Sequence, residues 1–261
     1  MSGPLAGRVA LVTGASRRRG VGAAVARRLA ADGASVFLHS WAPYDALRPG
    51  AADEGGAERL VKELRRAGAE VRHRSADLAD PEAPAALVAT AREAFGHIDI
   101  LVTGHTRNCG QSLEELTAAE FDLSSAVNTR ATLLLVQAFA AQHDNERPGG
   151  RIVLYSSGQS PCDEAEELPY LAAKAARQEV METLAAHLAP RDITVNSINR
   201  GPYDTGGAAG QRATKKDRTG GRWSTPQDTA RVIGWLVSAE ADWVTGQTIA
   251  SDGDWSALAG E

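Results

Sequence analysis

A tyrosine and a lysine stand four residues apart in the segment YLAAK, as Tyr170 and Lys174. In a helix, this spacing brings both side chains to one face. An ammonium group beside a phenol favours the phenolate and lowers the pKa of the phenol from about 10, so that it can transfer protons near neutral pH. By itself the pair would also suit an exposed helix face. Ser157, thirteen residues upstream, adds a hydroxyl that could bind a substrate carbonyl from the same side.

A glycine-rich segment, TGASRRRGVG at 13–22, joins an apolar run (8–13) to a helical pattern (21–32). Backbone N–H groups at the start of a helix bind phosphate, and the helix dipole favours its negative charge. The strand–loop–helix context is the one that a dinucleotide site requires. We therefore predict cofactor contacts from Gly14, Ser16, Arg17, Arg18, Arg19, Gly20, Val21 and Gly22.

The three arginines of this loop favour NADP(H) over NAD(H). Sites that prefer NAD usually carry an acid at the end of the second strand, whereas this strand ends in His39, Ser40 and Trp41, with no carboxylate until Asp45. A guanidinium attracts a 2′-phosphate that a carboxylate would repel. We favour Arg18 or Arg19 over Arg17 for this contact. The alternative is a solvated basic turn with no ligand.

The elements that must position these residues alternate along the chain. β-branched apolar runs predict strands at 8–13, 35–39, 70–74, 99–103, 151–156, 193–198 and 247–251. Helical patterns lie between them, including one that ends at Gly33, one with Asp80 as N-cap and one with Thr225 as N-cap. Such alternation predicts an α/β fold, a doubly wound parallel sheet of about seven strands with helices on both faces, in a single domain over 1–261. Ligands bind beyond the carboxyl ends of such strands.

The composition of the 261 residues excludes several classes of protein. A net charge of −5 and a pI of about 5.7 do not suit a nucleic-acid or membrane-surface binder, and no apolar run is long enough to cross a membrane. The two cysteines, Cys109 and Cys162, fit no metal-ligand spacing, and we expect no metal. The N-terminal residues do not resemble a signal peptide, so we expect a cytoplasmic protein.

Taken together, the motifs resemble those of the short-chain dehydrogenase/reductase family over nearly the whole chain, with the 3-oxoacyl-[acyl-carrier-protein] reductases as the nearest type. The glycine loop resembles the family's TGxxxGxG with two residues added, ADL at 76–78 its adenine-binding pair, and VNTR at 127–130 its helix asparagine. SS at 156–157 and YLAAK supply further residues of the family's catalytic tetrad. NSINRGPYDTG at 196–206 is similar to the segment that holds the nicotinamide carboxamide, and WVTGQTIASDG at 243–253 to the last strand.

The resemblance implies hydride transfer between a nicotinamide and a carbonyl or alcohol in a Rossmann-type fold. Tyr170 would be the acid or base, Lys174 would lower its pKa and hold the nicotinamide ribose, Ser157 would orient the carbonyl oxygen, and Asn128 would anchor a water that relays protons. The remaining cofactor contacts implied by position are Ser40, Asp77, Leu78, Gly104, Gly201, Tyr203 and Thr205. Members are usually homodimers or homotetramers, and the apolar run at 131–140 suits either an interface or the core.

The chain departs from the family pattern in places. TGHT at 103–106 replaces NNAG, so that His105 either approaches the nicotinamide or simply packs in the loop. Arg200 stands where a proline usually precedes Gly201, and it either binds an anion or points to solvent. Asp254 replaces a glycine. Enoyl reductases of the wider family also have lengthened glycine loops but space tyrosine and lysine seven apart, and here that position is Glu167.

We therefore predict an NADPH-dependent reductase of a small-molecule carbonyl, with a 3-oxoacyl or polyketide-like ketone as the favoured substrate and a lid at 203–222. The alternative is a non-redox relative that keeps the fold and the nucleotide site as a sensor, scaffold or catalyst of another reaction. The changes at 103–106 and at Arg200 motivate that alternative, while the Asn128, Ser157, Tyr170 and Lys174 set argues against it.

Overall fold

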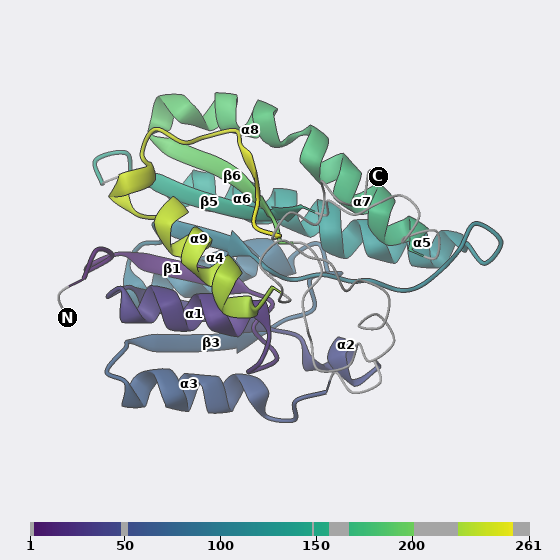
Figure 1. Ribbon diagram of the computed structural model, residues 1–261, viewed down its shortest axis with the longest axis horizontal. Helices are drawn as coiled ribbons and strands as arrows, with labels where there is room; N and C mark the ends of the chain where they lie inside the picture. The colour runs from purple at the N-terminus through teal and green to yellow at the C-terminus, as the bar shows by residue number, and fades with distance from the viewer. Residues whose placement is uncertain (1–2, 48–51, 148, 157–166, 201–223, 253–261) are drawn as a thin grey trace.

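A seven-stranded parallel sheet forms the centre of the protein (Figure 1). The computed structural model describes residues 3–47, 52–147, 149–156, 167–200 and 224–252. The strands are β1 (Val9–Thr13), β2 (Ser35–Ser40), β3 (Val71–Ser75), β4 (Ile100–Thr103), β5 (Gly150–Ser156), β6 (Ile193–Asn199) and β7 (Thr248–Ala250). Their order is β3-β2-β1-β4-β5-β6-β7, with every neighbouring pair parallel. The predicted doubly wound fold is confirmed, and all seven predicted strands are present.

Helices cover both faces of this sheet. Within the described residues they are α1 (Val21–Ala31), α2 (Ala42–Ala46), α3 (Gly56–Arg66), α4 (Ala83–Phe95), α5 (Ala118–Ser125), a π-helix (Ala126–Arg130), α6 (Ala131–Gln142), α7 (Leu168–Glu179), α8 (Met181–Leu188) and α9 (Pro226–Leu236). Short 3-10 turns lie at Ala189–Arg191 and Ala239–Ala241. Helix α1 packs against α9 on one face, and α4 packs against α6 on the other. No helix in the described ranges is long and apolar enough to span a bilayer.

The strands divide their side chains between two separate cores. Ala10 and Val12 of β1 face the core under α1 and α9, while Leu11 between them faces the core under α4 and α6. Successive side chains of a strand point to opposite faces, so a strand covered on both sides must be apolar throughout. This explains why these segments are continuous apolar runs in the sequence.

The helix ends follow local capping chemistry, with one correction. Thr225 caps α9 as predicted, in a capping box with Asp228, and Gly33 follows α1 with φ +99°. Asp80, however, is not the N-cap of α4, which begins at Ala83 after Glu82. The Asp80 carboxylate instead accepts a hydrogen bond of 2.9 Å from the backbone N–H of Glu82. This turn comes before the helix, and the predicted N-cap lies two residues before the observed one.

The segment 40–56, which the sequence suggested was irregular, contains the short helix α2. Helix α2 lies on the side of the sheet to which the parallel strands point (Figure 1). It therefore carries its side chains over the edge where ligands bind in this class of fold. The segment also contains Asp53, which holds Arg18 and Arg59. The predicted lid at 203–222 lies outside the described residues.

Candidate active site

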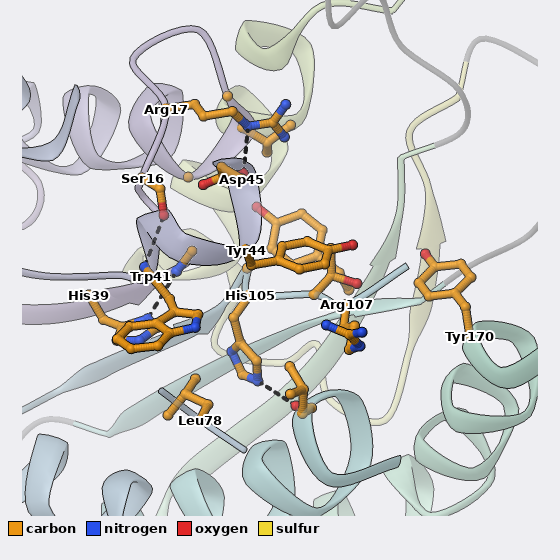
Figure 2. Close-up of a pocket in the computed structure, with 18 of the residues that line it drawn as sticks. Ser16, Arg17, His39, Trp41, Tyr44, Asp45, Leu78, His105, Arg107 and Tyr170 are labelled. Carbon is orange, nitrogen blue, oxygen red and sulfur yellow. Dashed lines mark hydrogen bonds and ion pairs between the residues drawn. The ribbon is translucent and has the colours of Figure 1, made fainter. Parts of the chain in front are cut away.

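One pocket extends along the carboxyl ends of the strands (Figure 2). Figure 2 shows Trp41 and His39 toward one end and Tyr170 at the other, with His105 and Arg107 between them. The predicted site residues that line it are Gly14, Ser16, Arg17, Gly20, Val21, Gly22, Asp77, Leu78, Gly104, Tyr170 and Lys174. The glycine loop and the Tyr170–Lys174 pair therefore share one pocket.

The glycines of the loop are required by close contacts. A Cβ on Gly14 would stand 2.4 Å from the carbonyl oxygen of Gly104, and Gly14 also has a φ of +76°. A Cβ on Gly22 would stand 2.5 Å from the carbonyl oxygen of Gly14. No side chain caps the start of α1, and its first turn carries no acid. This bare helix start beside a narrow glycine turn suits the phosphates of a dinucleotide.

The three arginines of the loop point in different directions. Arg17 lines the pocket, where its Nε lies 3.5 Å from Oδ1 of Asp45. The backbone N–H and Nε of Arg18 instead bind Oδ2 of Asp53, at 2.9 and 3.2 Å, on the outside of the loop. Arg19 is exposed and does not line the pocket. The preference for Arg18 or Arg19 over Arg17 is thus at odds with their placement.

Ser40 is buried and does not line the pocket, since its hydroxyl lies 2.8 Å from Nε2 of His73. Ser16 lies at the pocket and accepts a 3.0 Å hydrogen bond from the backbone N–H of Trp41. Asp77 accepts a hydrogen bond from the N–H of Ala79 at 2.9 Å, which orders the turn after β3. These contacts shape the pocket wall around Trp41.

His39 lines the pocket, although the sequence analysis named it only as one of the residues that end the second strand without an acid. Its Nδ1 accepts a hydrogen bond from the backbone N–H of Gly14 at 3.3 Å, while Nε2 donates to the carbonyl oxygen of Ala76 at 2.9 Å. Both contacts require the neutral ring with its proton on Nε2. Burial lowers the pKa of His39 to about 4 and so favours this form. A histidine in an otherwise apolar strand was the available signal.

His105 both packs in its loop and lines the pocket. Nε2 donates to the carbonyl oxygen of Val127 at 3.1 Å, so Nδ1 is the acceptor for the Thr13 hydroxyl at 2.7 Å. Burial holds the pKa of His105 well below its ordinary value, and the positive charges of nearby groups, including Arg177 and Lys174, act in the same direction. The neutral ring thus ties β1 to the π-helix.

Asn128 lies fully buried in the π-helix and organises the neighbouring loop. Its Oδ1 accepts hydrogen bonds from the hydroxyl of Thr106 and the backbone N–H of Arg107, both at 3.0 Å. Its Nδ2 donates to the carbonyl oxygen of Arg107 at 2.7 Å and to Ser124 Oγ at 3.0 Å. Because these contacts fill the usual capacity of an amide, the side chain fixes the loop after β4.

Tyr170 and Lys174 are buried on one face of α7, as their spacing predicted. The Lys174 ammonium lies 5.3 Å from the centre of the Tyr170 ring and 3.4 Å from the carbonyl oxygen of Tyr155. Burial, reinforced by the charges of Arg177 and Arg200, holds the pKa of Lys174 well below its ordinary value. At this distance from the ring, the protonated ammonium of Lys174 favours the phenolate form of Tyr170, whereas burial of the phenol opposes it.

Several predicted site residues lie outside the described residues: Ser157, Gly201, Tyr203 and Thr205. Their neighbours in the chain, Ser156 and Arg200, line the pocket beside Lys174. The roles given to these four residues stay predictions. Within the described ranges, no three His, Cys, Asp or Glu side chains gather as a metal site.

The middle of the pocket contains a contact between α2 and the loop after β4. The Tyr44 hydroxyl donates to the carbonyl oxygen of Asn108 and accepts from its N–H, both at 2.7 Å. The Arg107 guanidinium lies 5.5 Å from the centre of the Tyr44 ring and binds both carboxylate oxygens of Glu120, at 2.7 and 2.6 Å. Sequence reasoning missed Tyr44 and Arg107, because no motif connects these distant segments.

Comparison with known proteins identifies relatives over almost the full length. Residues 14–256 match the family model described as Enoyl-(Acyl carrier protein) reductase. The chain is 32% identical over 249 residues to the uncharacterized oxidoreductase YjdA of Bacillus subtilis, which covers 94% of this chain and 96% of the relative.

Two solved structures with a similar fold contain a nicotinamide cofactor. A blue fluorescent protein from a metagenomic library, in complex with NADPH, is 32% identical with a TM-score of 0.85, covering 97% of this chain and 99% of that one. The angucycline C-6 ketoreductase LanV with bound NADP is 31% identical with a TM-score of 0.84, covering 98% of each chain. The similarity extends across all the elements that form the pocket.

Proposed function

The chain belongs to the short-chain dehydrogenase/reductase family of oxidoreductases, and from this premise we propose that it uses NADPH to reduce a carbonyl group to an alcohol. The observation that carries the proposal is the single pocket with a glycine phosphate loop at one end and the buried Tyr170–Lys174 pair at the other. No side chain caps the first N–H groups of α1, and no larger residue fits at Gly14 or Gly22. Both features suit the binding of a dinucleotide.

The chain's own residues would provide the proton chemistry. The bound cofactor supplies the hydride, and the Tyr170 hydroxyl donates a proton to the carbonyl oxygen of the substrate. Lys174 lies close enough to the ring to stabilise the phenolate that remains. A developing negative charge needs a proton donor aimed at it in a site with little water, and the burial of both side chains meets that need.

The preference for NADPH rests on Arg17. It is the arginine of the loop whose guanidinium lines the pocket, and β2 ends in Ser40 with no acid at its end. Arg17 would leave Asp45 and bind the 2′-phosphate, since a phosphate dianion is the stronger partner for a guanidinium. The NADPH- and NADP-bound relatives support this cofactor.

A tryptophan-fluorescence titration of the purified protein with NADPH and with NADH tests this directly. Trp41 lines the pocket and should report binding. We expect NADPH to bind at least about tenfold more tightly, which corresponds to about 1.4 kcal/mol. Equal affinities would contradict the 2′-phosphate assignment. Binding of neither nucleotide would contradict the redox function and favour the non-redox alternative.

Carbonyl reduction is preferred here over reduction of an enoyl double bond, although the matching family model carries an enoyl reductase description. The position seven before Lys174 is Glu167, whose Oε1 accepts a 2.9 Å hydrogen bond from Nδ2 of Asn108. The Glu167 carboxylate therefore orders the loop after β4. It cannot act as the tyrosine that enoyl reductases carry at this position. Paired assays with a 3-oxoacyl thioester and the matching 2-enoyl thioester, each with NADPH, should show oxidation of NADPH only with the first.

We favour a polyketide-like or 3-oxoacyl ketone as substrate, supported by the similarity to the ketoreductase LanV. A panel of aromatic polyketide ketones and 3-oxoacyl thioesters tests this choice, and activity confined to simple aliphatic aldehydes would contradict it.

We also propose a homodimer or homotetramer. Five residues of α6, including Leu135 and Phe139, are buried in the protein's own core, so only part of the apolar run at 131–140 remains for an interface. Light scattering decides the oligomeric state.

A further inference from the structure

Helix α7 buries a third charged side chain on the face that carries the acid–base pair. Arg177 follows Lys174 by three residues and Tyr170 by seven, which are spacings of one helix face. All three side chains are buried, and Arg177 is only 2% exposed. It is the largest of the fully buried side chains. An arginine this deep needs partners for five N–H donors and one positive charge.

Its partners leave the charge unbalanced. Nη1 lies 3.3 Å from the Thr132 hydroxyl and 3.5 Å from the carbonyl oxygen of Asn128, both of which are neutral. Nη2 is buried with no acceptor among the described residues. No carboxylate forms an ion pair with Arg177 in the described part of the chain. Burying a guanidinium in this way is costly unless an anion offsets its charge.

Among the described residues, no unpaired acid faces this region. Glu120 on the adjacent α5 is held by both of its carboxylate oxygens to Arg107. The other titratable side chains from the surrounding elements are His105 after β4, Tyr155 of β5, Tyr170 and Lys174 of α7, and Arg200 after β6. Tyr170 is the one whose negative charge raises the pKa of Arg177, against the burial that lowers it to about 10.

We propose that Arg177 is a positioning residue whose buried positive charge stabilises the phenolate form of Tyr170 from beneath the pocket. It is not among the side chains that line the pocket, so it would act on Tyr170 through its charge and not by contact with a bound ligand. Tyr170, Lys174 and Arg177 are all buried on one face of α7, so a negative charge on the phenolate of Tyr170 offsets the positive charges of both cations. The proposal rests on the acid–base role of Tyr170 in the proposed function.

A titration that needs no substrate tests the inference. The ultraviolet absorbance of tyrosinate is followed against pH, and the difference from the Tyr170→Phe variant isolates Tyr170 from the other three tyrosines. The same difference is then measured in an Arg177→Gln background, in which an amide can still donate to Asn128 and Thr132. Two helical turns separate Tyr170 from Arg177 by roughly 10 Å. We therefore expect the titration midpoint of Tyr170 to rise by about one pH unit in the Arg177→Gln background.

Two further variants separate charge from packing. Arg177→Lys keeps the charge and should leave the midpoint near that of the wild type. Arg130→Met removes an exposed guanidinium from the end of the π-helix and should also leave it unchanged. If Arg177→Gln does not fold, Arg177→Met takes its place as the variant without the charge. Its Tyr170 midpoint is then compared with those of the wild type and of Arg177→Lys, which keep the charge.

An unchanged Tyr170 midpoint in the neutral variants would overturn the proposal, even if their thermal stability fell, because it would leave Arg177 a structural role only. A rise in midpoint together with an absence of any reductase activity would support Arg177 while contradicting the proposed function. The two failures are therefore distinguishable.

Discussion

Arg17 and Asp45 meet at the wall of the pocket, with the Nε of one 3.5 Å from the Oδ1 of the other. One comes from the glycine loop and the other from α2, and both line the pocket. Under the proposed function, this cation and this anion would together distinguish a cofactor with a 2′-phosphate from one without it. Both side chains are partly buried, so salt screens their interaction with each other and with a phosphate less than it would at a fully exposed site.

The first prediction concerns Arg17 and its neighbour. Arg17→Met should weaken NADPH binding by about ten- to hundredfold, since a charged hydrogen bond contributes about 1.5–3 kcal/mol, and should leave NADH binding nearly unchanged. Arg18→Met, in which the lost guanidinium faces Asp53, is the matched control and should change neither affinity. Fluorescence titration measures all four values. A larger effect from Arg18 would reverse the assignment.

Asp45 should oppose the same phosphate. Asp45→Asn removes a carboxylate that competes for Arg17, and we expect NADPH to bind about three- to tenfold more tightly. NADH binding should stay the same or fall. Isothermal titration at low and moderate salt provides the measurement, with a smaller gain at higher salt. Weaker NADPH binding would mean that Asp45 contacts the cofactor itself.

Tyr170 should be essential for turnover but not for cofactor affinity. Tyr170→Phe keeps the buried ring beside Lys174 and removes only the proton donor, so kcat should fall by about a hundred- to ten-thousandfold. NADPH affinity should change by less than about twofold, within about 0.4 kcal/mol. Steady-state kinetics on an accepted ketone and a parallel titration give the two numbers. Retained activity would show that another group donates the proton.

Asn128 should contribute strongly to stability. Asn128→Ala removes four hydrogen bonds and leaves the partly buried backbone N–H and carbonyl of Arg107 without these partners, so we expect a loss of about 2–4 kcal/mol in the free energy of unfolding. Asn145→Ala, an exposed asparagine that accepts a hydrogen bond from Arg191, is the control and should cost less than about 1 kcal/mol. Urea unfolding measures both. Equal losses would contradict the central role of Asn128.

His39 should make the protein less stable in mild acid. Its pKa is about 4 in the folded protein against about 6.5 when unfolded, so the unfolded chain binds the extra proton between these values. The contribution is fully present above pH 6.5 and is lost as the pH falls toward 4, up to about 3 kcal/mol. His39→Asn, whose amide oxygen can accept from Gly14, should reduce this dependence in urea unfolding at a series of pH values. An unchanged slope would contradict the buried neutral ring.

The strands and the paired catalytic face could be predicted because their signals are local. Continuous apolar runs predicted all seven strands, since a strand covered on both faces must be apolar, and the four-residue spacing placed Tyr170 and Lys174 together. The glycine loop was likewise recognisable from the spacing of its glycines. The structure gives the reason for this spacing, because backbone atoms leave no room for a Cβ on Gly14 or Gly22. The start of α4 was misplaced, since Asp80 suits a turn as well as an N-cap.

Contacts between distant segments could not be predicted in this way. Nothing local distinguishes Arg17 from Arg18, and Asp45 and Asp53, about thirty residues away, determine which of them faces the pocket. The contact of Tyr44 with Asn108 joins α2 to a loop after β4, and His39 binds Gly14 across neighbouring strands.

The sequence by itself determined the fold, the phosphate loop and the acid–base pair, because backbone sterics and side-chain periodicity act within a few residues. Only the tertiary structure decided which arginine lines the pocket, which histidines are neutral, and that Arg177 lies buried with no carboxylate partner in the described part of the chain. Burial and charge pairing depend on residues that the chain brings together from afar.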